Sequence, residues 1–341
     1  MYRVHEGFGP ETRTAVAAVR SAARLCRRVR EQLSPEVLSK KDKSPVTVAD
    51  FGSQAVVCRA LAQAFPGDSI IAEEDSTDLR TPANAAILEQ VVEQVRALGP
   101  VEDQGVSSSN VCAWIDHGAT SQSCKRFWTI DPIDGTKGFL RNEQYAVALA
   151  LVVDGKVVLG ALACPNLQID PGSSGASSGV VFLAGRGQGA YALPLDSAND
   201  PSQRRLIQVS RQDDPAAVRF CESVESGHSA QGDSAAIAAR LGIVAPPVRL
   251  DSQAKYGVVA RGEAEIYLRM PTRADYREKI WDHAAGVLIV EEAGGIVTDI
   301  TGQPLDFQHG RELTANRGVI VTNGRLHDRV LQTLAELGLA K

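Results

Sequence analysis

The sequence predicts a protein of the α/β class, with an α+β N-terminal half and an α/β C-terminal half. The chain has 341 residues, which is long for one hydrophobic core, and its 44% apolar and 23% charged residues are ordinary for a globular protein. Apolar residues recur at helical spacing in some segments and form short β-branched runs in others. In the second half these two patterns alternate, which implies helices that cover a sheet.

A polar, proline-containing stretch at residues 196–203 is the expected boundary between two domains, residues 1–200 and 201–341. Helical spacing in the first domain predicts helices at residues 11–33, 46–65 and 83–98. The strands expected there are residues 69–72, 126–130, 145–153, 156–163, 180–183 and 190–193. Asp154-Gly155 predicts a hairpin turn. Polar composition predicts loops at residues 105–125 and 170–179.

The second domain is predicted from the same two patterns, and no internal repeat of fixed period is present. Its expected strands are residues 206–209, 265–268, 296–298 and 318–321. Its expected helices are residues 233–241, 254–261, 282–293 and 325–337.

Charge and composition exclude several classes of partner. The formal net charge of −5 argues against a nucleic-acid polymer and leaves room for a small phosphorylated substrate held by a few local cations. No apolar run approaches the ~18–20 residues that a bilayer-spanning helix needs, so no membrane partner is expected. The six cysteines have no zinc spacing and are expected to be reduced. Cys112 and Cys124 flank a polar stretch that could expose them, and a regulatory disulfide among Cys112, Cys124, Cys164 and Cys221 stays open.

The composition of the first helical segment is the sequence evidence on the cellular compartment. Residues 13–30 are rich in Arg and Ala and lack acids, as in organelle transit peptides. Their apolar positions recur at helical spacing, which favours a structural helix. The expected location is therefore the cytoplasm, or a chloroplast or mitochondrion if a leader precedes the chain.

The most informative stretch is Asp131-Pro132-Ile133-Asp134-Gly135-Thr136, directly after an apolar, aromatic segment that reads as a strand ending at Asp131. Two carboxylates with the Ile133 carbonyl between them suit a hard divalent cation. Gly135 permits a tight turn or the close approach of a ligand. The alternative is an ordinary turn whose aspartates cap backbone amides.

Other acids stand at the ends of predicted elements: Asp50 early in a helix, Glu73 after a strand and Asp282 at a helix start. Each could be only a helix-start acid, a solvated loop acid or an N-cap. If these ends converge with Asp131 and Asp134, they form an oxygen-rich cage for two or more Mg²⁺ ions.

Such a cage suits the hydrolysis of a phosphate ester, because bound metal lowers the pKa of water and steadies the leaving oxygen. Thr136 could relay the proton of the attacking water if its hydroxyl is hydrogen-bonded to Asp50. The amides of Gly135 and Thr136 could hold phosphate oxygens if they begin a helix.

These residues resemble a known family. The stretch 131–136, the cluster 73–75 and the run 281–286 are similar to the lithium-sensitive, Mg²⁺-dependent phosphatases of the inositol monophosphatase superfamily. Residues 43–50, 134–141 and 276–283 more specifically resemble its 3′(2′),5′-bisphosphate nucleotidases, and the resemblance covers nearly the whole chain. Asn142 departs from a common glycine, a mild change because Asn tolerates left-handed backbone.

The resemblance implies a five-layered αβαβα sandwich of the sugar-phosphatase type. It implies hydrolysis of 3′-phosphoadenosine 5′-phosphate to AMP and phosphate, with the 2′ isomer or the 5′-phosphosulfate as further substrates and a place in sulfur assimilation. Domain 1–200 would bind two or three Mg²⁺ ions, and domain 201–341 would complete the metal site and bind the nucleotide. The implied metal ligands are Glu73, Asp131, Ile133, Asp134 and Asp282, with Asp50 and Thr136 as catalytic residues.

Substrate contacts are expected from Gly135 and Thr136 and, by resemblance, from His228, Ser252, Lys255 and Arg269. Lys and Arg would give charge-assisted bonds to the phosphate that is not cleaved. Two alternatives stay open: an inositol polyphosphate 1-phosphatase that uses the same site, and a catalytically silent nucleotide sensor. The protein is expected to be a monomer or a homodimer.

Overall fold

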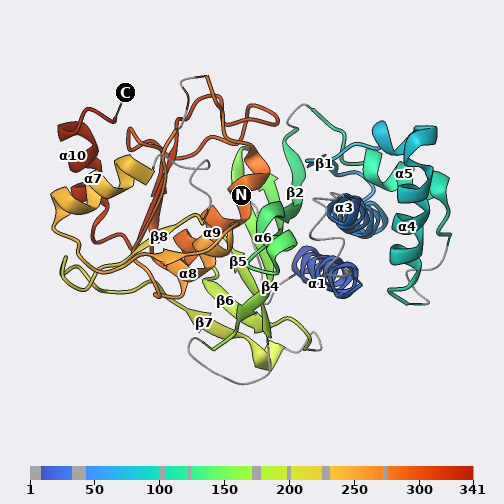
Figure 1. Ribbon diagram of the computed structural model, residues 1–341, viewed down its shortest axis with the longest axis horizontal. Helices are drawn as coiled ribbons and strands as arrows, with labels where there is room; N and C mark the ends of the chain where they lie inside the picture. The colour runs from blue at the N-terminus through green and yellow to red at the C-terminus, as the bar shows by residue number, and fades with distance from the viewer. Residues whose placement is uncertain are drawn as a thin grey trace.

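The computed structural model describes residues 9–32, 44–99, 105–121, 124–170, 178–197, 201–224, 231–271, 273 and 275–340. In Figure 1 these residues form five layers, with helices on both outer sides, two sheets, and a helical layer between the sheets. The predicted αβαβα sandwich is confirmed. The division at residue 200 stays a prediction.

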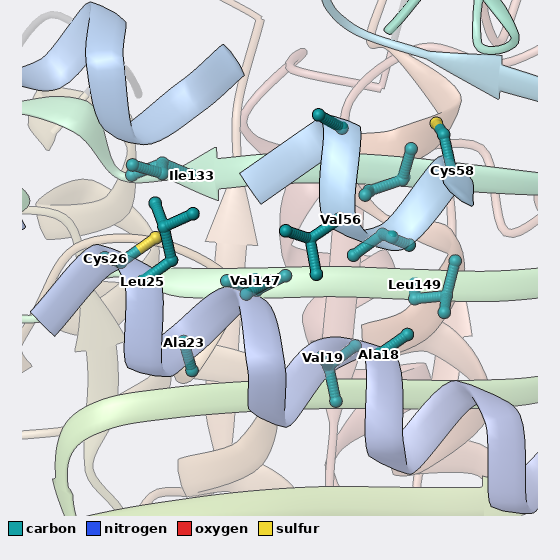
Figure 2. Packing of buried hydrophobic residues seen from close by; sticks show 14 of the residues in the cluster. Ala18, Val19, Ala23, Leu25, Cys26, Val56, Cys58, Ile133, Val147 and Leu149 are labelled. Carbon is teal, nitrogen blue, oxygen red and sulfur yellow. The ribbon is translucent and has the colours of Figure 1, made fainter. Parts of the chain in front are cut away.

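The first outer layer holds the N-terminal helices α1 (Pro10–Glu31), α3 (Ser44–Ala64), α4 (Ala85–Arg96) and α5 (Ser108–Asp116). Helix α1 buries its apolar face, including Ala15, Val19 and Cys26, against α3 and the first sheet (Figure 2). Gly52 lets the two helices approach closely, because a Cβ atom there would lie 2.9 Å from Leu25 Cδ2. Short 3₁₀ helices, η1 (Asp78–Arg80) and η2 (Pro82–Asn84), lead into α4.

The first sheet has seven strands in sequence order. They are β1 (Ser69–Ala72), β2 (Arg126–Asp134), β3 (Ala146–Val153), β4 (Lys156–Gln168), β5 (Ser178–Gly185), β6 (Ala190–Pro194) and β7 (Arg205–Ile207). Strands β1 and β2 are parallel, and the other neighbours are antiparallel. The predicted hairpin joins β3 and β4 at Asp154-Gly155, where both residues have positive φ. Strand β7 extends this sheet beyond residue 200, after the 3₁₀ helix η3 (Pro201–Gln203).

Helices α8 (Ala254–Ala260) and α9 (Ala284–Glu292) form the middle layer. Strand β3 shows why both faces of the first sheet are apolar. Val147 and Leu149 belong to the cluster under α1 and α3, while the intervening Ala148 and Ala150 belong to the cluster under α8 and α9. The small side chains on the second face leave room for α9. A sheet covered on both faces therefore reads as a continuous apolar run.

The second sheet has five strands in the order β11-β12-β10-β8-β9. They are β8 (Phe220–Glu222), β9 (Val248–Arg249), β10 (Ile266–Arg269), β11 (Ile296–Thr298) and β12 (Val319–Thr322). Helices α7 (Gln231–Leu241) and α10 (His327–Glu336) pack on its outer face through a third apolar cluster. Strands β8 and β9 were not predicted.

The loop prediction for residues 105–125 is wrong, because helix α5 occupies its centre. Ser107 caps the helix by accepting a hydrogen bond from the Asn110 amide at 3.2 Å. Val111, Cys112 and Ile115 provide a buried face, so a short apolar stripe inside a polar segment was missed.

All six cysteines are free. Cys124 is exposed, whereas Cys112 is buried, which contradicts its expected exposure. Burial raises the pKa of the Cys221 thiol to about 12 and also raises the pKa of Cys164, so both thiols are unreactive at neutral pH.

None of the helices among the described residues has the length and apolar character needed to cross a membrane.

Candidate active site

Strand β2 does not end at Asp131 as expected but continues to Asp134 through an irregularity. Asp131 pairs with Ala148 and Asp134 pairs with Ala146, so three steps along β2 match two steps along β3. In a regular strand, residues three apart face opposite sides of the sheet. The bulge changes the direction in which the following side chains point. Pro132 has no backbone N–H to donate, and the bulge is a place where the hydrogen bonds between strands do not need one. Asp131 and Asp134 therefore reach the same cavity.

Carboxylates from distant parts of the chain meet there. Oxygen atoms of Asp131, Asp134 and Asp282 all lie within 4.8 Å of one another. Asp282 stands in the 3₁₀ helix η5 (Ile280–Asp282), two residues ahead of α9 and not at its start as predicted. Glu73, directly after β1, borders the same cavity. This convergence places the acids in one cavity and not at separate, unrelated turns and caps.

The cavity has a volume of about 390 Å³ and is lined by segments from both sheets. Its walls come from β2, the start of α6 (Thr136–Arg141), the segment before α8, and β10. The lining residues are Glu73, Asp131, Ile133, Asp134, Gly135, Thr136, Lys137, Asp251, Ser252, Gln253, Lys255, Tyr267, Arg269, Tyr276 and Asp282.

Crowding of acids raises their pKa values. The Glu73 side chain is exposed at the cavity mouth, yet the surrounding protein and then Asp282 and Glu74 raise its pKa to about 8. Burial, followed by the charge of Asp282, raises the pKa of Asp134 to about 6. Asp131 is 2% exposed, and burial with Glu73 and Asp134 nearby raises its pKa well above the ordinary range. The site therefore concentrates negative charge that the nearby Lys255 and Arg269 offset only in part.

The backbone around Glu73 is held from two sides. Gln54 of α3 donates to the Glu74 carbonyl at 2.6 Å and accepts from the Glu74 amide at 3.0 Å. Arg311 donates from Nη2 to the Glu73 carbonyl at 3.0 Å, and its guanidinium lies 4.5 Å from the centre of the Trp281 ring. Arg311 thus joins the segment that carries Glu73 to the one that carries Asp282.

Asp282 lies beside a buried chain of polar groups. Arg269 pairs with Glu278 at 2.9 Å and with Asp282 at 3.7 Å. His283 contacts Glu278 at 3.1 Å through Nε2 and the Tyr256 hydroxyl at 2.7 Å through Nδ1. Oxygen and nitrogen atoms of Glu278, Asp282 and His283 are also within 4.8 Å of one another. A cation is excluded there, because both His283 nitrogens are occupied and Arg269 already supplies the positive charge.

Three of the four substrate residues predicted by resemblance lie at the cavity. Ser252, Lys255 and Arg269 line the cavity, while His228 lies outside the described residues. Lys255 is 2% exposed, and burial lowers its pKa. Its ammonium group donates to the Leu250 carbonyl at 3.4 Å and lies 5.2 Å from the Tyr267 ring centre. The Ser252 hydroxyl accepts from the Ala254 amide at 3.2 Å, so it also supports the start of α8.

Asp50 and Thr136, the predicted catalytic residues, are not hydrogen-bonded to each other. The exposed Thr136 hydroxyl donates to the Ile133 carbonyl at 3.5 Å. Asp50 is 9% exposed and is not among the described residues that line the cavity. Burial and the charges of Glu73 and Glu74 raise its pKa well above the ordinary range.

Gly135 and Asn142 frame helix α6 as expected. Gly135 adopts φ 88° directly before Thr136, and Asn142 adopts φ 59° directly after Arg141. A Cβ atom on Gly135 would lie 2.9 Å from Ser252 Cβ, so glycine allows two walls of the cavity to touch.

Sequence reasoning missed Gln253, Arg311, Asp251 and Tyr276. Gln253 and Arg311 act through contacts with backbone carbonyls, which leave no sequence pattern. Asp251 pairs with Arg141 across the cavity rim, and Tyr276 accepts from Arg269 at 3.4 Å. The sequence pointed to them only indirectly, because Asp251 and Gln253 flank the predicted Ser252 and Tyr276 begins the run 276–283.

The chain is similar to known proteins over nearly its whole length. The family described as "Inositol monophosphatase family" matches residues 10–339. The chain is 45% identical to a 3′(2′),5′-bisphosphate nucleotidase of Emericella nidulans, over 95% of this chain and 97% of that protein. It is 46% identical to one of Oryza sativa, over 96% and 94%. An inositol monophosphatase structure from Anabaena superposes with a TM-score of 0.62 at 22% identity, covering 96% of this chain and 95% of that one.

Proposed function

The chain belongs to the inositol monophosphatase family, and we propose that it is a Mg²⁺-dependent phosphomonoesterase that hydrolyses 3′-phosphoadenosine 5′-phosphate to AMP and phosphate. The family predicted from the motifs is thereby confirmed. Full-length similarity to curated bisphosphate nucleotidases makes the chain a phosphatase of that class. The single observation that supports the proposal most is the convergence of Asp131, Asp134 and Asp282 within one cavity.

The cavity residues fit a hard divalent cation. Asp131 Oδ1 is buried and has no hydrogen-bond partner among the described residues. Buried carboxylate oxygens normally have one, and lone pairs that no donor engages are free to coordinate a metal. Raised pKa values at Glu73 and Asp134 point the same way, because a bound cation would relieve the repulsion that raises them.

Glu73, Asp131, Asp134, Asp282 and the Ile133 carbonyl would hold the metal, which we propose to be two or three Mg²⁺ ions. When bound, Mg²⁺ would polarise the phosphoryl oxygens and lower the pKa of water.

The protein's own residues would position the ester and receive the proton of the attacking water. Thr136 stands at the cavity wall, where its hydroxyl can pass a proton inward. Asp50 has a raised pKa, so its carboxylate is a better proton acceptor at neutral pH than an ordinary aspartate. Because no hydrogen bond joins the two residues, the Thr136 side chain must turn away from Ile133 before it reaches Asp50.

The phosphate that is not cleaved would lie against Lys255 and Arg269. Both side chains face the same cavity as the acids, and both are charged donors. Lys255 is desolvated, so a bond from its ammonium group to a phosphate is stronger than one made in water. The 2′ isomer and the 5′-phosphosulfate would place their groups similarly.

The proposed function is tested by phosphate release from 3′-phosphoadenosine 5′-phosphate and from inositol 1,4-bisphosphate, each with Mg²⁺, with EDTA and with added Li⁺. We expect the nucleotide to be the better substrate, no turnover in EDTA, and inhibition by Li⁺. Faster turnover of the inositol ester would assign the alternative substrate. Nucleotide binding without turnover in Mg²⁺ would make the protein a sensor.

Lys255→Met should distinguish the two substrates. The change keeps the volume of the side chain and removes the remote phosphate contact, so kcat/KM should fall about tenfold or more for the nucleotide, since a charge-assisted bond is worth about 1.5–3 kcal/mol. The fall should be smaller for the inositol ester. Lys279→Met is the matched control, because Lys279 pairs with Glu312 at 2.6 Å and is not a cavity residue. Equal losses on both substrates would contradict the nucleotide assignment.

A further inference from the structure

Gln253 occupies an unusual place beside the cavity. It lies between the Ser252 turn and the first residue of α8, and it is 2% exposed. Its backbone amide donates to Asp134 Oδ2 at 2.5 Å. Its side chain donates from Nε2 to the Trp281 carbonyl at 2.8 Å and accepts through Oε1 from the Gly286 amide at 3.2 Å. One residue therefore contacts the end of β2, the η5 turn and the start of α9.

The two side-chain hydrogen bonds determine how the amide is oriented. The Trp281 carbonyl can only accept and the Gly286 amide can only donate, so the carboxamide fits in one orientation. Both bonds are buried, which makes a replacement by water costly. The η5 turn is therefore held at a set distance from the Gln253 backbone.

This arrangement fixes two acids relative to each other. Trp281 directly precedes Asp282 in η5, and the Gln253 backbone is bonded to the carboxylate of Asp134. Asp134 lies in β2, whereas Asp282 lies in η5, which is part of neither sheet. The backbone hydrogen bonds of a sheet therefore do not connect the two acids. Gln253 provides a short link between the two acids, through its own covalent bonds and its hydrogen bonds to Asp134 and to the Trp281 carbonyl.

We infer that Gln253 is a positioning residue that sets the spacing of the Asp134 and Asp282 carboxylates and thereby the affinity of the site for a divalent cation. The inference rests on the proposed function, because it assumes that these two acids are metal ligands. Groups that orient ligands from behind typically change metal affinity about 10- to 100-fold when they are removed. Gln253 itself would touch neither metal nor substrate through its side chain, which is occupied by Trp281 and Gly286.

The test uses Gln253→Met and Gln253→Asn. Methionine keeps the length of the side chain and removes both hydrogen bonds. Asparagine keeps the amide but is one methylene shorter, so it cannot reach both partners. Neither change alters the net charge, so a change in cation affinity reports geometry and not electrostatics.

Gln94→Met is the matched control. Gln94 is a buried glutamine on α4, 6% exposed, whose Nε2 donates to Gln32 at 2.8 Å. It lies in the outer helical layer, which Figure 1 shows on the far side of the first sheet from the middle helices. It therefore reports what the loss of a buried amide does to stability alone.

Mg²⁺ binding to the metal-free proteins is measured by isothermal titration calorimetry, together with thermal melts and the Mg²⁺ dependence of phosphate release. Both Gln253 variants should bind Mg²⁺ about 10- to 100-fold more weakly than wild type, with Gln253→Met the weaker. Their kcat at saturating Mg²⁺ should return to within a few-fold of wild type. Gln94→Met should lose thermal stability and keep its Mg²⁺ affinity.

Wild-type Mg²⁺ affinity in either folded Gln253 variant overturns the inference and leaves the proposed function standing. Weak affinity together with a kcat that stays low at saturating Mg²⁺ also overturns it, because the residue would then act on chemistry and not on spacing. A wild-type protein that takes up no Mg²⁺ overturns the proposed metal site instead.

Discussion

At the scale of single residues, the site depends on where a few carboxylate oxygens point. Asp131, Asp134, Glu73 and Asp282 could be predicted as a set because acids at element ends suit a metal cage. Their spacing could not be predicted, because it depends on the bulge in β2 and on contacts to backbone carbonyls. A carbonyl contact can be made by many side chains, so Arg311 and Gln253 left no recognisable pattern.

Asp134→Asn tests the metal assignment directly. The amide keeps the shape of the side chain but loses the charge that a cation needs. Turnover in Mg²⁺ should fall about 100-fold or more, since metal stabilisation of the transition state is worth several kcal/mol and 1.36 kcal/mol is a factor of ten. The melting temperature of the metal-free protein should stay close to that of wild type. Asparagine carries no charge, so the substitution removes the repulsion between residue 134 and Asp282 and does not add a destabilising one.

The control for this substitution is Asp196→Asn, a change of the same chemistry at a carboxylate that is 60% exposed and paired with Arg27 outside the cavity. It should leave turnover unchanged. Near-normal rates for Asp134→Asn would discard Asp134 as a ligand.

At the scale of elements, patterns predicted the regular parts and missed the irregular ones. The buried runs of β1 and β3 and the amphipathic α1 lie within a few residues of their expected positions. Helix α5 was missed because a short apolar stretch with three buried residues, inside a polar segment, gives too little periodicity. The extension of β2 past Pro132 was missed because proline usually ends a strand, and only the bulge makes it tolerable here.

Gly135→Ala tests the junction between β2 and α6. Alanine must adopt φ 88°, and its Cβ would lie 2.9 Å from Ser252 Cβ. Left-handed backbone costs a residue other than glycine about 1–3 kcal/mol, and the contact adds to this, so the free energy of unfolding should fall by at least ~1 kcal/mol. The KM for substrate should rise as well, because the two cavity walls are pushed apart.

Gly338→Ala separates the two effects in this test. Gly338 has φ 70° with nothing within 4 Å of an added Cβ, so it carries the backbone cost without the contact. Urea unfolding and steady-state kinetics should show a stability loss in both variants and a KM change only in Gly135→Ala. An unchanged KM in Gly135→Ala would mean that this turn does not shape the cavity.

At the scale of the whole molecule, the five layers follow from which faces are apolar. The first sheet is buried on both sides and the second carries helices on both sides, so the middle helices pack between the two sheets in one shared core, separate from the core under α7 and α10. Alternating patterns predicted helices on sheets, and the motif resemblance predicted the order of the layers. Pattern alone did not show that β7 belongs to the first sheet, because a three-residue edge strand is defined by its partner.

The clustered acids should also make the metal-free protein less stable as the pH rises. In the unfolded chain Glu73 has its ordinary pKa of 4.5 and is ionised above it, whereas in the folded protein its pKa is about 8. The folded state therefore binds more protons between these values, and its free energy of unfolding falls as the pH rises through this window. The buried His327, whose pKa is lowered from 6.5, adds an opposing slope of at most about half a proton at pH 6.5 that fades by pH 8, so the acids set the sign.

Thermal melts in EDTA between pH 6.5 and 8 should therefore show a falling Tm, and saturating Mg²⁺ should remove the slope, because bound cations favour the ionised carboxylates. A Tm in EDTA that is flat or rises with pH over this range would contradict the crowding of these acids.

The central claim is that carboxylates from β1, β2 and η5 form one metal site. It is tested most directly by diffraction from crystals soaked in Mn²⁺, whose anomalous signal locates the bound ions. We expect peaks among Asp131, Asp134 and Asp282, with one next to Glu73. Peaks elsewhere, or an empty acid cluster at saturating Mn²⁺, would contradict it.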